Sequence, residues 1–346
     1  MCISAPSRQL QILFPLTSRL PPPRPYPMPP IRGAKVVILD TVTGKVVSRH
    51  QLEPGKRVTA SAWAHAAAGG RTYTFATAAA EEVTMWTLDP FTGQLAGRAV
   101  VIGSVRREYT CLLFSQDSNW LYGGTTSSDV VTINVQRLSV QMSHPVCSSG
   151  VGALLTAPDG SGVTIVAGRD GSLSTFNAAG GSWRELRPFA TVPGAVSSLT
   201  LSSDKSAFLL GTAQGAVLRL DRATLQLSTI SQSQGGSLTG VSFAAGQPEA
   251  VAVSSLEGSI AVWNMQDFTL QCKAQEPVQA GGALCCVMTR DTIMSGRSLL
   301  GAHHKTQPPS LSLPHLSPHP SPLQLLLPHL PSSFPHPSPS PVKRFY

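Results

Sequence analysis

From about Lys35 onward, apolar and polar residues alternate in short bursts of four to seven residues, separated by turns rich in Gly, Asp, Ser and Asn. This two-residue period is typical of β-strands with one buried face. No 11-residue stretch has the 3.6-residue period of an amphipathic helix. The pattern therefore predicts an all-β protein.

The bursts recur in sets of four, and the third burst of each set carries a large apolar anchor. The anchors are Trp86, Ile133, Phe176, Leu220 and Trp263, in the segments VTMWTLD, VVTINV, SLSTFN, AVLRLD and SIAVWN, and they are 47, 43, 44 and 43 residues apart. Self-similarity at this period indicates repeated four-stranded units. We expect an anchor at a fixed place to fill the gap between neighbouring sheets.

A turn precedes each anchor from the second onward. The turns are SSDV with Asp129, RDGS with Gly171, AQGA with Gly215 and LEGS with Gly258. Glycine adopts positive φ without steric cost, and tight hairpins need this conformation. The turns therefore predict hairpins that connect the second and third strands.

The first strands of the units repeat as well. They are RVTASAWA, YTCLLFS, GVGALLTA, AVSSLTLS, SLTGVSFA and ALCCVMT, so at least six units are partly present. Lys35 to Leu52 is interpreted as the last two strands of an earlier unit, and a final unit is expected to stop at about Arg297. The series of units is therefore expected to be incomplete.

The two ends of the chain differ from its body in composition. Nine prolines lie in the first 30 residues and twelve lie after residue 307, against eight between them. Residues 1–34 are interpreted as a disordered or non-native extension, with an organelle transit peptide as the alternative. Residues 298–346 are interpreted as a disordered Pro/Ser/His-rich tail, polyproline-like in patches. Binding of this tail to SH3 or WW modules is one alternative, and appended non-coding sequence is another.

The charges and cysteines narrow the functional classes. The net charge of +8 comes from the ends, because the stretch between Lys35 and His303 holds 18 basic and 18 acidic residues. A neutral body gives little support to nucleic-acid binding. No run approaches the roughly 18 apolar residues of a membrane-spanning helix, so no membrane partner is expected. The cysteines lack Cys-x-x-Cys spacing, and reduced thiols packed as small apolar side chains are expected.

The residues that could carry chemistry have structural alternatives. Common enzyme signatures such as the phosphate-binding loop and the Gly-x-Ser-x-Gly elbow are absent from the sequence. Asp159, Asp170, Asp204 and Asp221 lie in or beside turns, where an aspartate caps backbone N–H groups. His50, His65 and His144 are isolated in sequence. Arg98, Arg106 and Arg107 form a short basic cluster that could meet an acidic partner or lie in a solvated loop.

Four-stranded units of this period with a tryptophan on the third strand resemble WD40 repeats, whose blades stack radially into a β-propeller. The motif is degenerate here, because MWTLD and VWNM replace the Trp-Asp pair and no Gly-His dipeptide opens a repeat. We therefore expect the usual polar tetrad of such blades to be absent. Blade stability is then expected to depend on apolar packing and ladder hydrogen bonds.

Three longer stretches resemble the family of cilia- and flagella-associated protein 52, WD-repeat proteins of motile axonemes. They are MWTLDPFTGQL followed by LYGGTTSSDVVTINV, then AVSSLTLSSDKSAFLLGTAQGAVLRLD, then EAVAVSSLEGSIAVWNMQDFTL. The resemblance spans Glu81 to Arg297 and implies two consecutive propellers, with a junction near Thr191 to Ala195. Blades at 35–193 would end a first propeller and blades at 194–297 would start a second. The chain would then be the middle of a longer protein, with open ladder edges that favour aggregation.

The resemblance also implies a function. A member of this family is non-enzymatic, lies in the ciliary or flagellar axoneme and the cytoplasm, and supports motility as a microtubule inner protein of doublets. The implied partners are tubulin and other doublet proteins, with no nucleic acid, membrane, metal, cofactor or small-molecule substrate. The alternative is a generic cytosolic WD40 scaffold or adaptor. A propeller enzyme would need polar side chains converging on the channel, whereas the expected innermost strands are mostly apolar or small.

Overall fold

The structure is a computed structural model of the chain. It describes residues 10–13, 16–18, 35–40, 45–53, 56, 58–65, 72–79, 81–103, 106–157, 163–177, 184–202, 204–231, 236–244, 247–275, 283–288 and 293–300. All regular elements in these residues are β-strands. Within the described part, no helix has the length and hydropathy needed to cross a bilayer. The all-β prediction is confirmed.

Five sheets contain four antiparallel strands each, hydrogen-bonded in chain order. The first two are β5 (Val58–Trp63), β6 (Tyr73–Ala79), β7 (Glu82–Leu88) and β8 (Leu95–Ala99), then β9 (Tyr109–Phe114), β10 (Trp120–Thr125), β11 (Asp129–Asn134) and β12 (Ser139–Pro145). The third is β13 (Val151–Thr156), β14 (Val163–Gly168), β15 (Ser172–Asn177) and β16 (Arg184–Thr191). The last two are β17 (Val196–Leu201), β18 (Ala207–Thr212), β19 (Val217–Asp221) and β20 (Leu227–Ser231), then β21 (Leu238–Ala244), β22 (Gln247–Ser255), β23 (Ser259–Asn264) and β24 (Leu270–Gln275). We call each of these sheets a blade.

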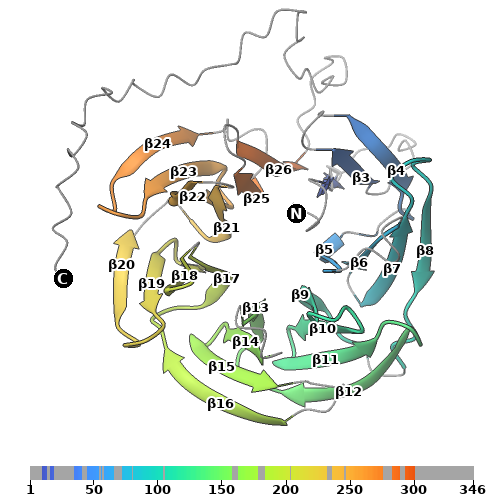
Figure 1. Cartoon of the computed structure of the whole chain (residues 1–346), viewed down its shortest axis with the longest axis horizontal. Helices are drawn as coiled ribbons and strands as arrows, with labels where there is room; N and C mark the ends of the chain where they lie inside the picture. Colours follow the sequence, from blue (N-terminus) through green and yellow to red (C-terminus); the bar gives the residue numbers. More distant parts are fainter. Residues whose placement is uncertain are drawn as a thin grey trace, which may run out of the picture. The chain divides into compact units, whose positions relative to one another are not determined.

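The blades within Met1–Ala302 follow one another around a common centre (Figure 1). The innermost strands β5, β9, β13, β17 and β21 contact one another in that order, and the fourth strands lie on the outer rim. The first and third strands coincide with the segments expected from the sequence to within one or two residues. This arrangement is a β-propeller, so the predicted fold class is confirmed.

Two three-stranded sheets flank the five blades. One contains β3 (Lys35–Asp40), β4 (Val46–Gln51) and β1 (Leu10–Leu13) in the order β1-β3-β4, and the other contains β25 (Ala283–Met288), β26 (Ile293–Leu300) and β2 (Leu16–Ser18) in the order β2-β26-β25. The strands β3 and β4 are the pair expected between Lys35 and Leu52. Among the described residues, each of these end sheets contains three strands.

Two short strands lie within residues 1–34, the segment predicted to be a disordered or non-native extension. There β1 pairs with β3 and β2 pairs with β26. A sheet edge bonds to the backbone of any extended segment, so a proline-rich composition did not reveal these short pairings.

The remaining domain boundaries stay predictions. Residues on both sides of position 193 belong to one compact unit, Met1–Ala302, in which β13 contacts β17. Of the predicted tail at 298–346, residues 298–300 lie in β26, and the interpretation of residues 301–346 as disordered falls outside the described residues.

The core lies between neighbouring blades, and each anchor packs against the blade that precedes its own. Phe176 of β15 is buried and meets the ring of Tyr122 in β10 edge to face, with 5.6 Å between ring centroids. Trp86 shares a cluster with Val36 and Ile38 of β3. Trp263 packs on a cluster of apolar side chains, some of which belong to strands of the preceding blade. The expectation that the anchors fill the gaps between sheets is confirmed.

One blade retains a polar contact that the sequence analysis did not expect. The indole Nε1–H of Trp86 donates to Oγ1 of Thr77 at 2.8 Å, and both side chains are buried. The ring of His50 meets Trp86 edge to face, 4.8 Å between centroids. A threonine on the neighbouring strand thus supplies one polar contact to the anchor of this blade, while the absence of the usual polar tetrad stays a prediction.

Candidate interaction surfaces

The innermost strands share a β-bulge that links consecutive blades. The register shifts at the second residue of each such strand, at Thr59, Thr110, Gly152, Ser197, Thr239 and Leu284. A bulge leaves one residue outside the ladder and bends the strand. We call these positions the inner bulges.

Hydroxyl groups at two inner bulges join adjacent blades. Oγ1 of Thr110 donates to the carbonyl of Val151 at 2.7 Å, and Oγ of Ser197 donates to the carbonyl of Leu238 at 2.6 Å. Each acceptor is the first residue of the next innermost strand. These hydroxyls therefore hold neighbouring blades together, and their protons are committed to backbone carbonyls.

Gly152 makes the corresponding contact without a side chain. A Cβ built at this position would lie 1.9 Å from the carbonyl oxygen of Val196, the first residue of β17. Only glycine therefore fits at this inner bulge. Aligning the predicted first strands reveals the signal, because the second residue is hydroxyl-bearing or glycine in every one that the structure describes with side chains.

One face of the propeller carries turns that are capped by aspartate or asparagine. Strands alternate in direction within a blade, so the first and third turns of every blade lie on the same face. Their caps accept a backbone N–H two or three residues ahead, and among the described residues they are Asp89, Asp117, Asn134, Asp204, Asp221, Asn264 and Asp267. We call this the aspartate face.

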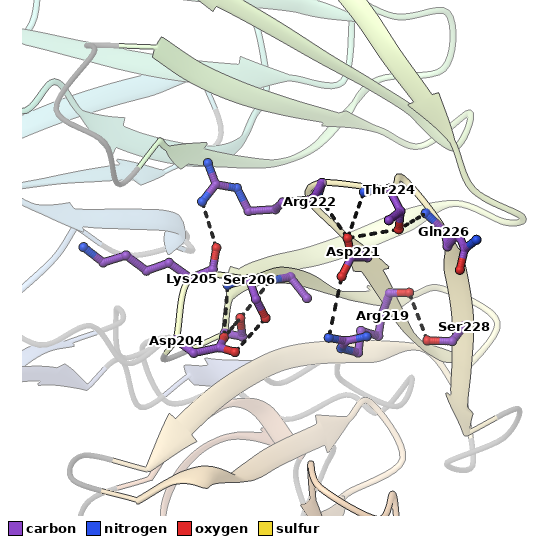
Figure 2. Close-up of polar contacts among 12 residues, drawn as sticks. Asp204, Lys205, Ser206, Arg219, Asp221, Arg222, Thr224, Gln226 and Ser228 are labelled. Atoms are coloured by element: carbon purple, nitrogen blue, oxygen red, sulfur yellow. Dashed lines mark hydrogen bonds and ion pairs between the residues drawn. The ribbon is translucent and has the colours of Figure 1, made fainter.

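Figure 2 shows the aspartate face of the β17–β20 blade. The first turn contains Asp204 and Lys205, and the third turn contains Asp221 and Arg222. The guanidinium Nη1 of Arg222 donates to the carbonyl of Lys205 at 2.8 Å and thereby joins the two turns. The same guanidinium lies 5.7 Å from the ring centroid of Phe208, a cation–π distance.

Local hydrogen bonds keep these carboxylates ionised. Hydroxyl and backbone donors from Ser202 and Ser206 lower the pKa of Asp204 to about 2. The backbone N–H and hydroxyl of Thr224 lower the pKa of Asp221. A carboxylate held in this way is a poor general acid or base at neutral pH.

The opposite face carries turns with positive φ. Gly171, Gly215 and Gly258 have φ values of 82°, 87° and 86°, as the sequence predicted. In the SSDV turn, the left-handed position is occupied by Ser128 with a φ of 70°, one residue before the aspartate that the sequence analysis singled out. We call this the glycine face.

Asp129 instead forms a polar cluster at the glycine face. Its side chain is 8% exposed and pairs with the guanidinium of Arg107, and it accepts hydrogen bonds from the hydroxyls of Thr125 and Ser143. Burial opposes the charge of Asp129, but these three donors outweigh it and lower the pKa of the carboxyl. The cluster connects β10, β11, β12 and the segment before β9.

The short basic cluster is dispersed by this arrangement. Arg107 is held by Asp129, and Arg106 pairs with Glu81 at 3.3 Å in an exposed position. Arg98 is exposed on β8. The three arginines therefore do not present one basic surface.

The other candidate residues occupy structural positions. Asp170 caps its turn and also accepts from the backbone N–H and hydroxyl of Ser148, at 2.7 and 2.6 Å. Asp159 falls outside the described residues. The backbone N–H of His65 donates to Ser118 at 3.0 Å, and Nε2 of His144 lies 3.4 Å from the Met142 sulfur.

The described thiols have the environment of core residues. Cys111 and Cys147 pack at the edge of one apolar cluster, and Cys272 is partly buried. Burial raises the pKa of Cys111 to about 11 and also raises that of Cys147. Such thiols are weak nucleophiles. No group of three or more His, Cys, Asp or Glu side chains suited to a metal occurs in the described residues.

Four exposed apolar side chains form a repeated feature of two adjacent blades. Leu225 and Phe268 occupy the same place in the third turns, and both have φ of 56°. Leu227 and Leu270 open the outer strands β20 and β24. All four are between 38% and 46% exposed. We call them the rim residues.

These features define the class of protein. The described residues form a WD40-type β-propeller in which hydrogen-bonded polar side chains cap turns, join blades and bind one anchor, and which presents two turn faces and a rim. Among known proteins, the chain is similar to cilia- and flagella-associated protein 52 of Chlamydomonas reinhardtii, with 24% identity over 191 residues. The match covers 53% of this chain and 29% of that protein, so this chain spans less than a third of its length. The resemblance inferred from the sequence is confirmed.

No protein-family model matches the chain.

Proposed function

We propose that this protein is a non-enzymatic WD-repeat structural component of motile cilia or flagella. It binds tubulin and other doublet proteins as a microtubule inner protein of the axoneme, and it supports ciliary motility. The observation that carries the proposal is the similarity to a cilia- and flagella-associated protein over 191 residues.

The state of the polar side chains supports a binding role. The cap carboxylates accept hydrogen bonds from their own turns, and the inner-bulge hydroxyls of Thr110 and Ser197 donate to backbone carbonyls. Groups occupied in this way stabilise the scaffold and position its surface turns. A rigid scaffold with repeated exposed turns is suited to holding other proteins.

We assign the rim residues as the apolar surface through which the propeller contacts a partner protein. Two adjacent blades present a matching pair of apolar side chains each, in a body whose charges balance. Contact with a protein surface removes such side chains from water, at about 25 cal/mol per Å² of apolar area.

Salt extraction of axonemes tests the proposal. A tagged full-length chain is expressed in ciliated cells, and isolated axonemes are washed with increasing salt. We expect the chain to stay with the doublets at salt concentrations that release outer-surface proteins, since a luminal protein is enclosed by the microtubule wall. Release at moderate salt would contradict the inner location.

A matched pair of variants tests the rim residues. Leu225→Asn with Phe268→Asn removes two apolar side chains and retains the left-handed turns, because asparagine tolerates this conformation. We expect less of this variant in the doublet fraction. Phe91→Ser is the control, because Phe91 is a single side chain, 76% exposed, on a different blade.

The alternative function is a cytosolic WD40 scaffold or adaptor. It predicts a soluble complex that is independent of cilia and equal extraction of all variants. Full recovery of the tagged chain in the cytosolic fraction of ciliated cells would favour it.

A further inference from the structure

Leu138 occupies the same place in its third turn as the rim residues Leu225 and Phe268, yet it is buried. All three have φ between 53° and 56°, and each lies four residues after the cap of its turn. Leu138 is 9% exposed, against 44% for Leu225 and 38% for Phe268. One turn position is therefore buried in one blade and exposed in two others.

The cover of Leu138 is an extended segment that follows the outer strand of the preceding blade. The backbone N–H of Val101 donates to the carbonyl of Leu138 at 2.8 Å, and the N–H of Val140 donates to the carbonyl of Val101 at 3.1 Å. The segment forms a parallel β-bridge there. Val100 belongs to the apolar cluster that contains Leu138, and Ile102 packs against that cluster, whereas the side chain of Val101 is exposed. The segment therefore binds through the backbone of its middle residue and the apolar side chains on either side.

Leu225 and Leu227 offer the same two backbone groups as the covered turn. Leu227 pairs with the third-strand residue just before the cap, the register that Val140 also has. The pair on its turn side is hydrogen-bonded, because the N–H of Asp221 donates to the carbonyl of Gln226 at 3.0 Å. Backbone groups alternate in direction along an antiparallel strand. The N–H of Leu227 therefore points away from β19, toward the outside of the blade.

Pro193 explains why this copy of the turn is uncovered. Val192, after β16, donates its backbone N–H beside the second turn of its own blade at 2.9 Å, as Val100 does after β8. Pro193 thus stands where Val101 stands in the covered copy, and proline has no N–H to donate. Within the part of the chain that the structure describes, no backbone N–H is bonded to the carbonyl of Leu225.

We propose that the rim at Leu225 and Leu227 binds an extended segment of a partner protein, in the way that the covered turn binds its own chain. The segment has an apolar residue, any residue and a second apolar residue. The backbone of the middle residue bonds to the carbonyl of Leu225 and the N–H of Leu227, and its neighbours cover the leucine side chains. Phe268 and Leu270 repeat the turn conformation and the ladder register in the next blade. The inference rests on the proposed function and specifies the partner as a strand that adds to a sheet edge.

Peptide binding to the purified full-length chain tests the proposal. The probe is a fluorescein-labelled peptide with the sequence of residues 97–104, GRAVVIGS, and fluorescence anisotropy measures its binding. Methylation of the backbone nitrogen of Val101 in the peptide removes the donor to the rim, and methylation at Arg98 is the control. We expect the first change to weaken binding by about tenfold or more and the second to leave it unchanged. Equal binding of the two methylated peptides, or no saturable binding of the unmodified peptide, would overturn the proposal.

Side-chain variants locate the contact. In the peptide, Val101→Lys should leave binding unchanged because this side chain is exposed, whereas Ile102→Lys should weaken it. In the chain, Leu225→Asn with Phe268→Asn should weaken binding of the unmodified peptide, and Phe91→Ser should not. Equal losses for the two lysine peptides, or unchanged binding to the rim variant, would contradict the assigned contact.

The outcome of peptide binding is separate from that of axoneme extraction. Peptide binding by a chain that leaves axonemes at moderate salt would contradict the inner location and retain the strand contact. A chain that stays with the doublets but does not bind the peptide would contradict the strand contact and retain the inner location.

Discussion

At the residue scale, the two tryptophan anchors occupy matching places but differ in their hydrogen bonds. Thr77 lies two residues beyond the Trp86 partner in β6 and accepts the indole N–H. Val253 lies two residues beyond the Trp263 partner in β22, so the position that corresponds to Thr77 carries a methyl group in place of a hydroxyl. The Nε1 atom of Trp263 is buried without a hydrogen-bond partner among the described residues. A buried donor in this state costs about 1 to 3 kcal/mol.

Restoring the acceptor should offset that cost. We expect Val253→Thr to leave the urea midpoint unchanged or raise it, because the new hydroxyl meets the indole N–H of Trp263. The matched control is Val166→Thr, which occupies the same register beside Phe176, an anchor with no donor. The control should lose about 1 to 3 kcal/mol for a buried hydroxyl without this partner. Equal losses in the two variants would contradict the assigned register.

Asp129 should make stability depend on pH. Its folded pKa lies below the unfolded value near 3.9. Its stabilisation is therefore fully present above that unfolded value and is lost as the pH falls through the lower folded value. Asp129→Asn should cost about 2 kcal/mol at pH 7, because hydrogen bonds to a charged group are lost. Urea midpoints between pH 5 and pH 2 should fall more steeply for the original chain than for the variant. Parallel curves would show that Asp129 does not contribute in this way.

At the element scale, strand order, repeat length and the packing of the anchors between blades were predictable, whereas the hydrogen bonds between blades at the inner bulges were not. Alternation and the turns before the anchors located the first and third strands, because burial of one face dictates a two-residue period. The inner bulges were not predicted, because a bulge inserts one residue without interrupting the apolar pattern of the strand, and its signal emerges only when the first strands are aligned. The short strands β1 and β2 were not predicted either, because their pairing depends on backbone groups that every sequence carries.

Gly152 tests the blade contact at the inner bulge. Gly152→Ala should destabilise the fold by about 1 to 3 kcal/mol or more, because the added Cβ meets the carbonyl oxygen of Val196. Ser197→Ala, at the same position of the next blade, removes one hydroxyl and should cost about 1 kcal/mol. Urea unfolding measures both. A Gly152→Ala loss no larger than that of Ser197→Ala would mean that β13 and β17 are farther apart than described.

At the scale of the whole molecule, the candidate surfaces were less predictable than the fold. Asp170, Asp204 and Asp221 were correctly assigned to capping, because short polar side chains in turns satisfy nearby N–H groups. Arg106 and Arg107 do not form one basic surface, because each is paired with a carboxylate from a distant part of the sequence. The rim residues could not be predicted, because the sequence does not distinguish an exposed leucine from a buried one.

The ciliary assignment is tested most directly by imaging doublet microtubules at high resolution. Cryo-electron microscopy of axonemal doublets from cells with and without this protein would compare the luminal wall. We predict a propeller-shaped density on the inner surface of the doublet that disappears when the protein is absent. An unchanged lumen, or a lost density on the outer surface, would contradict the account.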